Sequence, residues 1–172
     1  MNLPQIVFQT SPRWFVVSKP PGWALAARAS TSQPCIERYL SPIIGTDKLF
    51  FPIEMDTRIR ALAIVCTDRG TQAQFEKFKQ FGLIQSTYRL HLDCACEDIP
   101  STSLPAGMRI TCREPQSRTA ELESDHSVTF RKISEALSGR VRNNDSNLFR
   151  LVFPDPLNPK APENLIVEAP DS

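Results

Sequence analysis

Short apolar runs of strand length alternate with turn residues along most of the chain. The most continuous run, "ALAIVC" at 61–66, is typical of a buried strand. Similar runs rich in β-branched and aromatic residues predict further strands at 5–9, 13–18, 86–94, 107–112, 118–124, 127–136, 147–153 and 164–169.

Two segments show the periodicity of amphipathic helices instead. The segment 31–44 offers Ser32 as an N-cap, and Pro42 limits the length of the helix. The segment 71–81 follows a strand and a capping turn, and it places three phenylalanines on one face: Phe75, Phe78 and Phe81. Few helices beside many mostly antiparallel strands predict an α+β fold with a mixed, mostly antiparallel sheet.

Length and charge narrow the classes of function. The chain has 172 residues, enough for one domain with a hydrophobic core, which we place at 1–153, followed by a proline-rich tail at 154–172. Twenty Lys and Arg against nineteen Asp and Glu give a net charge of +1, so no global positive field attracts nucleic acid. Any RNA contact must come from a local patch.

The cysteines and the absence of long apolar stretches bear on the compartment. Five cysteines are an odd number, and Cys66 lies inside the buried strand candidate, where a free thiol packs as a small hydrophobe. We therefore expect an intracellular, reducing compartment, with cytoplasm and mitochondrion both open. No stretch approaches the roughly 18 to 20 apolar residues of a membrane span, so no membrane partner is expected.

Asp56 is the first candidate for chemistry, because it follows an apolar segment and precedes the strand at 61–66. Loops anchored by a rigid strand often carry reactive groups, but aspartate is also a common turn residue. This stretch alone leaves both interpretations open.

The wider order of motifs favours the reactive interpretation. "RWFVVSKPPGWAL", then "FPIEMDTRIRALAIVCTD", then "STYRLHL" resemble the catalytic domain of RluA-type pseudouridine synthases, which isomerise uridine in ribosomal or transfer RNA. Lys19, Pro20 and Gly22 match the family's first element, Asp56 matches its second and Tyr88 its third. The resemblance spans about residues 5–153.

The resemblance implies a mechanism and a partner. Asp56 would be the nucleophilic carboxylate that lets the uracil detach, turn and rejoin through carbon, and Tyr88 would stack on the uracil and assist proton removal. A structured RNA must then present a flipped uridine, with cations on its phosphates. The candidate RNA-binding residues are Lys19, Arg58, Arg60, Arg140 and Arg142. No cofactor is expected, and Cys94 and Cys96 have too few partners for a metal site.

The chain departs from the family around the acid. The family's His-Arg-Leu is Ile53-Glu54-Met55 here, and its later Gly-Arg-Thr-His-Gln-Ile-Arg block has no clear counterpart. We interpret "SGRVRNN" at 138–144 as a basic hairpin between two strands. A partly buried carboxylate that lacks its arginine tends toward a raised pKa, although Arg58 or Arg60 could supply the cation.

These departures predict an RNA-associated protein that keeps the synthase fold with impaired or lost isomerase activity, bound to ribosomal RNA or a ribonucleoprotein particle. One alternative is an active synthase that uses Asp56, with Arg58, Arg60 or Arg140 replacing the usual cations. The other is a structural ribonucleoprotein subunit that contacts mainly protein, ribosomal proteins included, with its cleft filled by a partner or by its own tail.

Overall fold

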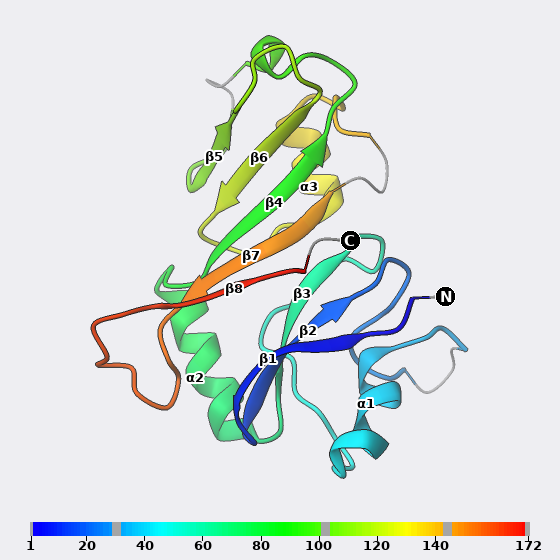
Figure 1. Ribbon diagram of the computed structural model, residues 1–172, viewed down its shortest axis with the longest axis vertical. Coiled ribbons are helices and arrows are strands. Elements are labelled where there is room, and N and C mark those ends of the chain that lie inside the picture. Colours follow the sequence, from blue (N-terminus) through cyan, green and yellow to red (C-terminus); the bar gives the residue numbers. More distant parts are fainter. Residues whose placement is uncertain (1, 29–31, 101–103, 143–145, 171–172) are drawn as a thin grey trace.

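The strands form two antiparallel sheets that follow one another along the long axis of the molecule (Figure 1). The computed structural model describes residues 2–28, 32–100, 104–142 and 146–170. The three-stranded sheet has the order β1-β2-β3, and its strands are Gln5–Ser11, Trp14–Lys19 and Ala61–Cys66. The five-stranded sheet has the order β5-β6-β4-β7-β8. Its strands, β4 to β8 in chain order, are Gln85–His91, Met108–Thr111, Thr119–Ser124, Asn147–Phe153 and Leu165–Glu168.

Three α-helices and one short 3₁₀ helix complete the described fold. They are α1 (Ile36–Ile44), α2 (Arg69–Gln80), α3 (Phe130–Ala136) and η1 (Cys96–Asp98). The predicted α+β class with mostly antiparallel strands is confirmed.

The two sheets meet where the start of β3 lies beside the start of β7. Arg60 and Asn147 form a parallel bridge there, and the amide of Leu148 donates to the carbonyl of Arg60 at 3.0 Å. The residues just before β3 are therefore held against both sheets, and Asp56 lies in this connection.

An aromatic cluster joins the two sheets at the other end of β3 and β7. Trp14 of β2, Phe75 of α2 and Phe153 of β7 are all fully buried and meet edge to face, with ring centroids 5.4 to 5.6 Å apart. Such contacts add to the free energy of burial. Asp68 caps α2, since its carboxylate accepts from the amide of Thr71 at 2.7 Å.

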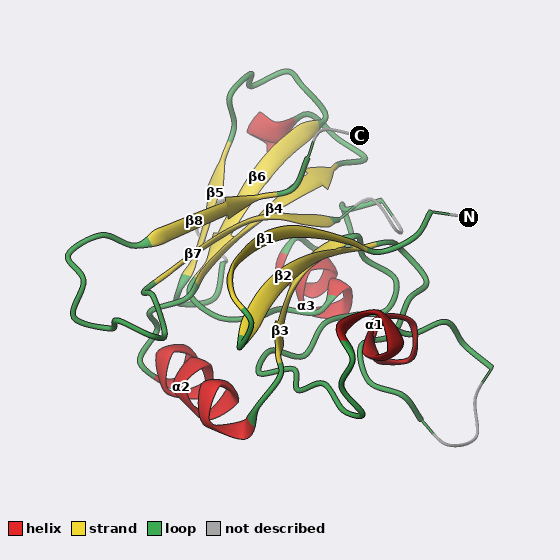
Figure 2. Ribbon diagram, turned by 60° about the horizontal axis from the view of Figure 1, so that its bottom comes forward, coloured by secondary structure: helices red, strands yellow, loops and turns green. Residues whose placement is uncertain are grey.

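A second core cluster lies on the other face of the three-stranded sheet, where α1 packs. Figure 2 shows β3 running between α1 and α2. The helix α1 differs from its prediction at both ends: its N-cap is Cys35, not Ser32, and it continues through Pro42 to Ile44. Gly45, in the left-handed region with φ of 83°, ends it.

The strand predicted at 127–136 is wrong, because most of this segment forms α3. The alternation of Ser127, Val128 and Thr129 suggested a strand, but Thr129 acts as an N-cap and accepts from the amide of Lys132 at 3.2 Å. The apolar spacing of Phe130 and Ile133, both buried, is helical. Consequently the segment 138–144 follows a helix rather than a strand, and its last two residues lie outside the described part.

The segment that follows β7 belongs to the same sheet. The segment after residue 153 returns to the sheet, since β8 pairs with β7 and the amide of Ala169 donates to Phe149. The division into a domain and a tail stays a prediction.

A disulfide joins Cys96 and Cys112, whereas Cys66 is a fully buried free thiol, packed as predicted. Neither feature identifies the compartment.

We predict that Phe153→Ala lowers the free energy of unfolding by about 3–5 kcal/mol, because it removes a fully buried ring from the aromatic cluster between the sheets. Chemical denaturation measures this loss. The matched control is Phe81→Ala, which should change stability by less than about 0.5 kcal/mol. Phe81 was predicted to share the buried face of α2, but it is 72% exposed. Equal losses in the two variants would contradict this description of the core.

Candidate active site around Asp56

Asp56 lies in a turn that its own side chain stabilises. The amide of Ile59 donates to the carbonyl of Asp56 at 3.4 Å, and the amide of Arg58 donates to Oδ1 at 2.9 Å. A short acid that bonds the backbone two residues on is favoured in such turns. The turn lies between Ile53 and Ile59, both buried, and these residues fix it to the core.

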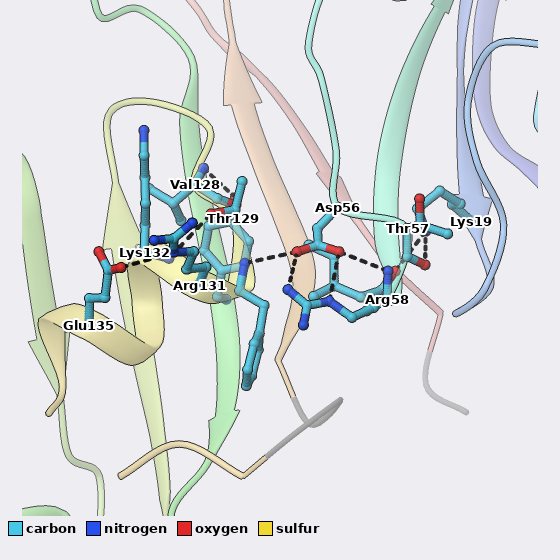
Figure 3. A network of polar contacts seen from close by, with 12 residues as sticks. Lys19, Asp56, Thr57, Arg58, Val128, Thr129, Arg131, Lys132 and Glu135 are labelled. Atoms are coloured by element: carbon cyan, nitrogen blue, oxygen red, sulfur yellow. Dashed lines mark hydrogen bonds and ion pairs between the residues drawn. The ribbon is translucent and has the colours of Figure 1, made fainter. Parts of the chain in front are cut away.

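Both oxygens of the Asp56 carboxylate are engaged (Figure 3). The Arg58 side chain donates from Nε to Oδ1 at 3.2 Å and from Nη2 to Oδ2 at 3.0 Å. The amide of Phe130, the first residue of α3, donates to Oδ2 at 3.2 Å. The guanidinium also lies 5.2 Å from the centroid of the Phe130 ring. One carboxylate thus ties the turn before β3 to the start of α3.

These bonds favour the ionised form of Asp56. Burial by itself would raise the pKa of this carboxyl, but the side-chain and backbone hydrogen bonds of Arg58, its positive charge and the Phe130 amide together outweigh burial. The pKa therefore lies below its ordinary value of 3.8. The raised pKa expected for an acid without its arginine is wrong here, because Arg58 supplies the cation within two residues.

Lys19 supports the turn from the opposite side and does not reach the surface. Its side chain is fully buried, and Nζ donates to the carbonyls of Ile59 at 2.8 Å, Thr57 at 3.2 Å and Pro20 at 3.3 Å. Burial lowers the pKa of Lys19 to about 8, and the negative charge of Asp56 limits the fall. In this position Lys19 holds the Asp56 turn, and it cannot contact RNA as predicted without moving.

Tyr88 lies behind the start of α3. The side chain is 1% exposed, and its hydroxyl donates to the Val128 carbonyl at 3.4 Å and accepts from the Val128 amide at 3.2 Å. Burial raises the pKa of Tyr88, and the bonds with Val128 and Ser127 oppose this only in part. In this arrangement the ring has no free face for a base.

The remaining predicted cations lie away from Asp56. Arg60 lines a pocket with Ser18, Asn147 and Pro170, on the side of β8. Arg140 follows the last turn of α3 and donates to the Asp98 carbonyl at 2.6 Å, while the amide of Arg142 bonds the carbonyl of His91. A helix of this length is about 10 Å long, so the start and end of α3 are well separated. Among the predicted cations in the described part of the chain, Arg58 is the one whose side chain bonds the Asp56 carboxylate.

Phe130 and Val128, whose backbones contact Asp56 and Tyr88, were not predicted as site residues. The available signal was Thr129 followed by helically spaced Phe130 and Ile133, which predicts a helix start at this place. The RNA-contacting role of the other cations stays a prediction.

No group of three or more His, Cys, Asp and Glu side chains within the described residues is arranged to hold a metal ion. No helix in the described ranges is both long and apolar enough to cross a bilayer.

Comparisons with known proteins identify the fold. No family model matches the sequence, and no curated protein matches it. Among solved structures, the chain is similar to human RNA pseudouridylate synthase domain containing 4, with a TM-score of 0.65 and 12% identity over 96% of this chain and 87% of the other. It is similar to human RNA pseudouridylate synthase domain containing 1, with a TM-score of 0.60 and 12% identity over 98% and 84%.

A third structure, a crystal structure of pseudouridylate synthase, gives a TM-score of 0.62 and 14% identity. The match covers 81% of this chain but only 62% of that one. At these identities the comparisons show a pseudouridine synthase-like fold. The resemblance to the RluA subfamily stays a prediction.

We predict that the pKa of Asp56, followed by carbon NMR of its carboxyl group, lies below 3.8 and rises in Arg58→Gln. Because the folded-state pKa is depressed, Asp56 contributes stability above its unfolded pKa of about 3.9 and loses it as the pH falls through the folded value. The stability difference between the protein and Asp56→Asn should therefore shrink below about pH 4.

The control for this titration is Arg131→Gln, which removes an arginine from an exposed ion pair with Glu135 on α3. This variant should leave the pKa of Asp56 unchanged. A pKa that is the same in the protein and in Arg58→Gln would contradict the pairing of Arg58 with Asp56.

We also predict that Tyr88→Phe lowers the free energy of unfolding by about 1–2 kcal/mol, since it leaves the buried Val128 amide without its acceptor. Thermal or chemical denaturation measures this. Tyr39→Phe is the matched control, because the hydroxyl of Tyr39 has no hydrogen-bond partner within the described residues. If both variants are as stable as the protein, the Tyr88 hydroxyl does not hold the start of α3.

Proposed function

We propose that the protein binds structured RNA, ribosomal or transfer, through its pseudouridine synthase-like fold and that its isomerase activity is strongly impaired. A ribosomal or other ribonucleoprotein particle is the assembly that would present such RNA. Three features support the proposal: the fold, the presence of Asp56 in the loop before β3, and the hydrogen bonds that the chain itself makes to this acid.

One observation carries the proposal: both groups expected to do the chemistry are occupied by the chain itself. The Asp56 carboxylate is 12% exposed and has bonds from Arg58 and the Phe130 amide. The Tyr88 ring is buried, and its hydroxyl is bonded to the Val128 backbone. A nucleophile needs a free oxygen directed at the substrate, and a base can stack on Tyr88 only where its ring face is open.

The cost of opening this site supports low activity. To expose Tyr88 and to free Asp56 Oδ2, the segment 127–130 must break its bonds to both residues. A carboxylate bonded to backbone amides and an arginine is also a weaker nucleophile than a free one. Losses of a few kcal/mol in the stabilisation of the transition state are common when such groups are misplaced, and each 1.36 kcal/mol reduces the rate tenfold.

A second candidate function is an active RNA uridine isomerase, and the position of Arg58 favours it. Arg58 keeps Asp56 ionised, which the nucleophile requires, without the later arginine of the family. In this reaction the bond from N1 of uracil to the ribose breaks, a bond from C5 forms, C5 loses a proton and N1 gains one. The product has the composition of the substrate, so no cofactor is consumed.

The two candidates separate in one experiment with purified protein and transcribed ribosomal and transfer RNA. RNA binding is measured by filter retention, and pseudouridine formation is mapped along each RNA. We expect binding to structured RNA with pseudouridine formation roughly 100-fold or more below that of an active synthase on its own substrate. Asp56→Asn should bind RNA as the protein does.

Two outcomes would overturn the proposal. Pseudouridine that forms rapidly at a defined site and disappears in Asp56→Asn would establish the active isomerase. A protein with no affinity for any structured RNA would exclude both candidates and favour a subunit that contacts mainly protein.

A further inference from the structure

An open pocket of about 610 Å³ lies next to the Asp56 turn and is built from four separate stretches of chain. The lining residues are 24–26 and 28, 48–51, then 54, 55 and 57 on either side of Asp56, and Arg69 and Gln72 in the first turn of α2. Its volume falls within the range of ligand pockets and exceeds what a single ion needs. None of its lining residues belongs to the Asp56–Phe130 contact described above.

Three cations line this pocket, and two of them share one aromatic ring. Nζ of Lys48 lies 5.6 Å and Cζ of Arg69 lies 5.7 Å from the centroid of the Phe50 ring, and Arg28 also lines the pocket. Phe50 itself is fixed, because its backbone pairs with Cys66 at the end of β3. The Phe50 ring thus attracts two positive groups that line the pocket.

These three cations differ in their pairing from several other arginines of the described fold. Within the described ranges, none of Arg28, Lys48 and Arg69 has a carboxylate at ion-pairing distance. Several arginines elsewhere do: Arg13, Arg58, Arg109, Arg113, Arg131 and Arg150. The carboxylate that lines the pocket is Glu54, so cations outnumber acids there by three to one.

An anion in the pocket would relieve the repulsion between these cations. Two positive groups near one ring repel each other, and a phosphate between them converts that repulsion into charge-assisted hydrogen bonds. Asp68, the N-cap of α2, is already bonded to Arg13 and Thr71, and it forms no ion pair with Arg69.

The position of the pocket identifies the kind of anion. Met55 and Thr57, the two chain neighbours of Asp56, both line it. A polynucleotide with one nucleotide at Asp56 can therefore reach this pocket with a neighbouring phosphate. We infer that the pocket binds the phosphodiester backbone of a single-stranded RNA segment that flanks the nucleotide at Asp56, with Lys48 and Arg69 as the phosphate ligands. This inference rests on the proposed RNA-binding function.

The test uses the double variant Lys48→Ala with Arg69→Ala in the full chain. Binding of a fluorescein-labelled, single-stranded oligouridylate is measured by fluorescence anisotropy over a range of salt concentrations. Two lost phosphate contacts should weaken binding roughly tenfold or more at about 0.1 M salt. They should also reduce the slope of log affinity against log salt by about 1.4, since each contact contributes about 0.7 for a single strand.

Two further variants make the result specific. Lys77→Ala with Lys79→Ala removes the same charge from the opposite end of α2, outside the pocket, and should bind within about twofold of the protein. Lys48→Arg with Arg69→Lys keeps both charges and should retain most of the affinity. Circular dichroism confirms that each variant is folded.

The outcomes separate this inference from the proposed function. If the protein binds RNA and the Lys48/Arg69 double alanine variant binds equally well, the inference fails while the proposed function stands. If the two alanine pairs weaken binding equally, the effect is general charge and the inference also fails. If the unmodified protein binds neither the oligouridylate nor a transfer RNA transcript, the proposed function itself fails, and the inference with it.

Discussion

The Asp56 carboxylate is the contact on which the arrangement of the whole site depends. It closes its own turn through the amide of Arg58, neutralises the Arg58 guanidinium and accepts from the Phe130 amide. On the other side of the turn, the buried ammonium of Lys19 holds three carbonyls. A buried cation behind the turn and a carboxylate in front of it fix the connection that enters β3. Because the start of β3 touches β7, this connection also positions the two sheets.

The same contacts explain why an intact acid does not imply an active enzyme. Val128 and Phe130 are two residues apart, and they engage Tyr88 and Asp56 respectively. A displacement of the segment 128–130 breaks the bonds of both side chains, so one movement of the chain opens both groups. Arg58, in contrast, can stay with Asp56 throughout, since its bond is local and its side chain is half exposed.

Much of the fold could be predicted from the sequence, because burial patterns are local. β3 and β7 occur within the bounds that their apolar runs indicate, and the capped helix follows β3 as expected. The segment that became α3 was missed, because Ser127 to Phe130 alternates like a strand while the Thr129 cap decides otherwise. The cap of α1 was missed for a similar reason: a cysteine sulfur replaces the expected hydroxyl.

The candidate site was predicted in part. The sequence alone places Asp56 in the loop before β3. It also offers Arg58, two residues later, as the partner of the acid. The burial of Lys19 and Tyr88 depends on segments 38 or more positions away along the chain, which no local pattern reveals. The pocket beside Asp56 has the same origin, since Lys48 and Arg69 meet only through the Phe50 ring.

The central claim is that the chain itself keeps Asp56 closed, and hydrogen exchange of the Phe130 amide tests it most directly. NMR would follow this exchange in the free protein and with bound structured RNA. The account predicts that the amide is protected in both states, because Asp56 still accepts its proton when RNA is bound. Loss of protection on RNA binding would contradict the account, since it would show that RNA releases the carboxylate for chemistry.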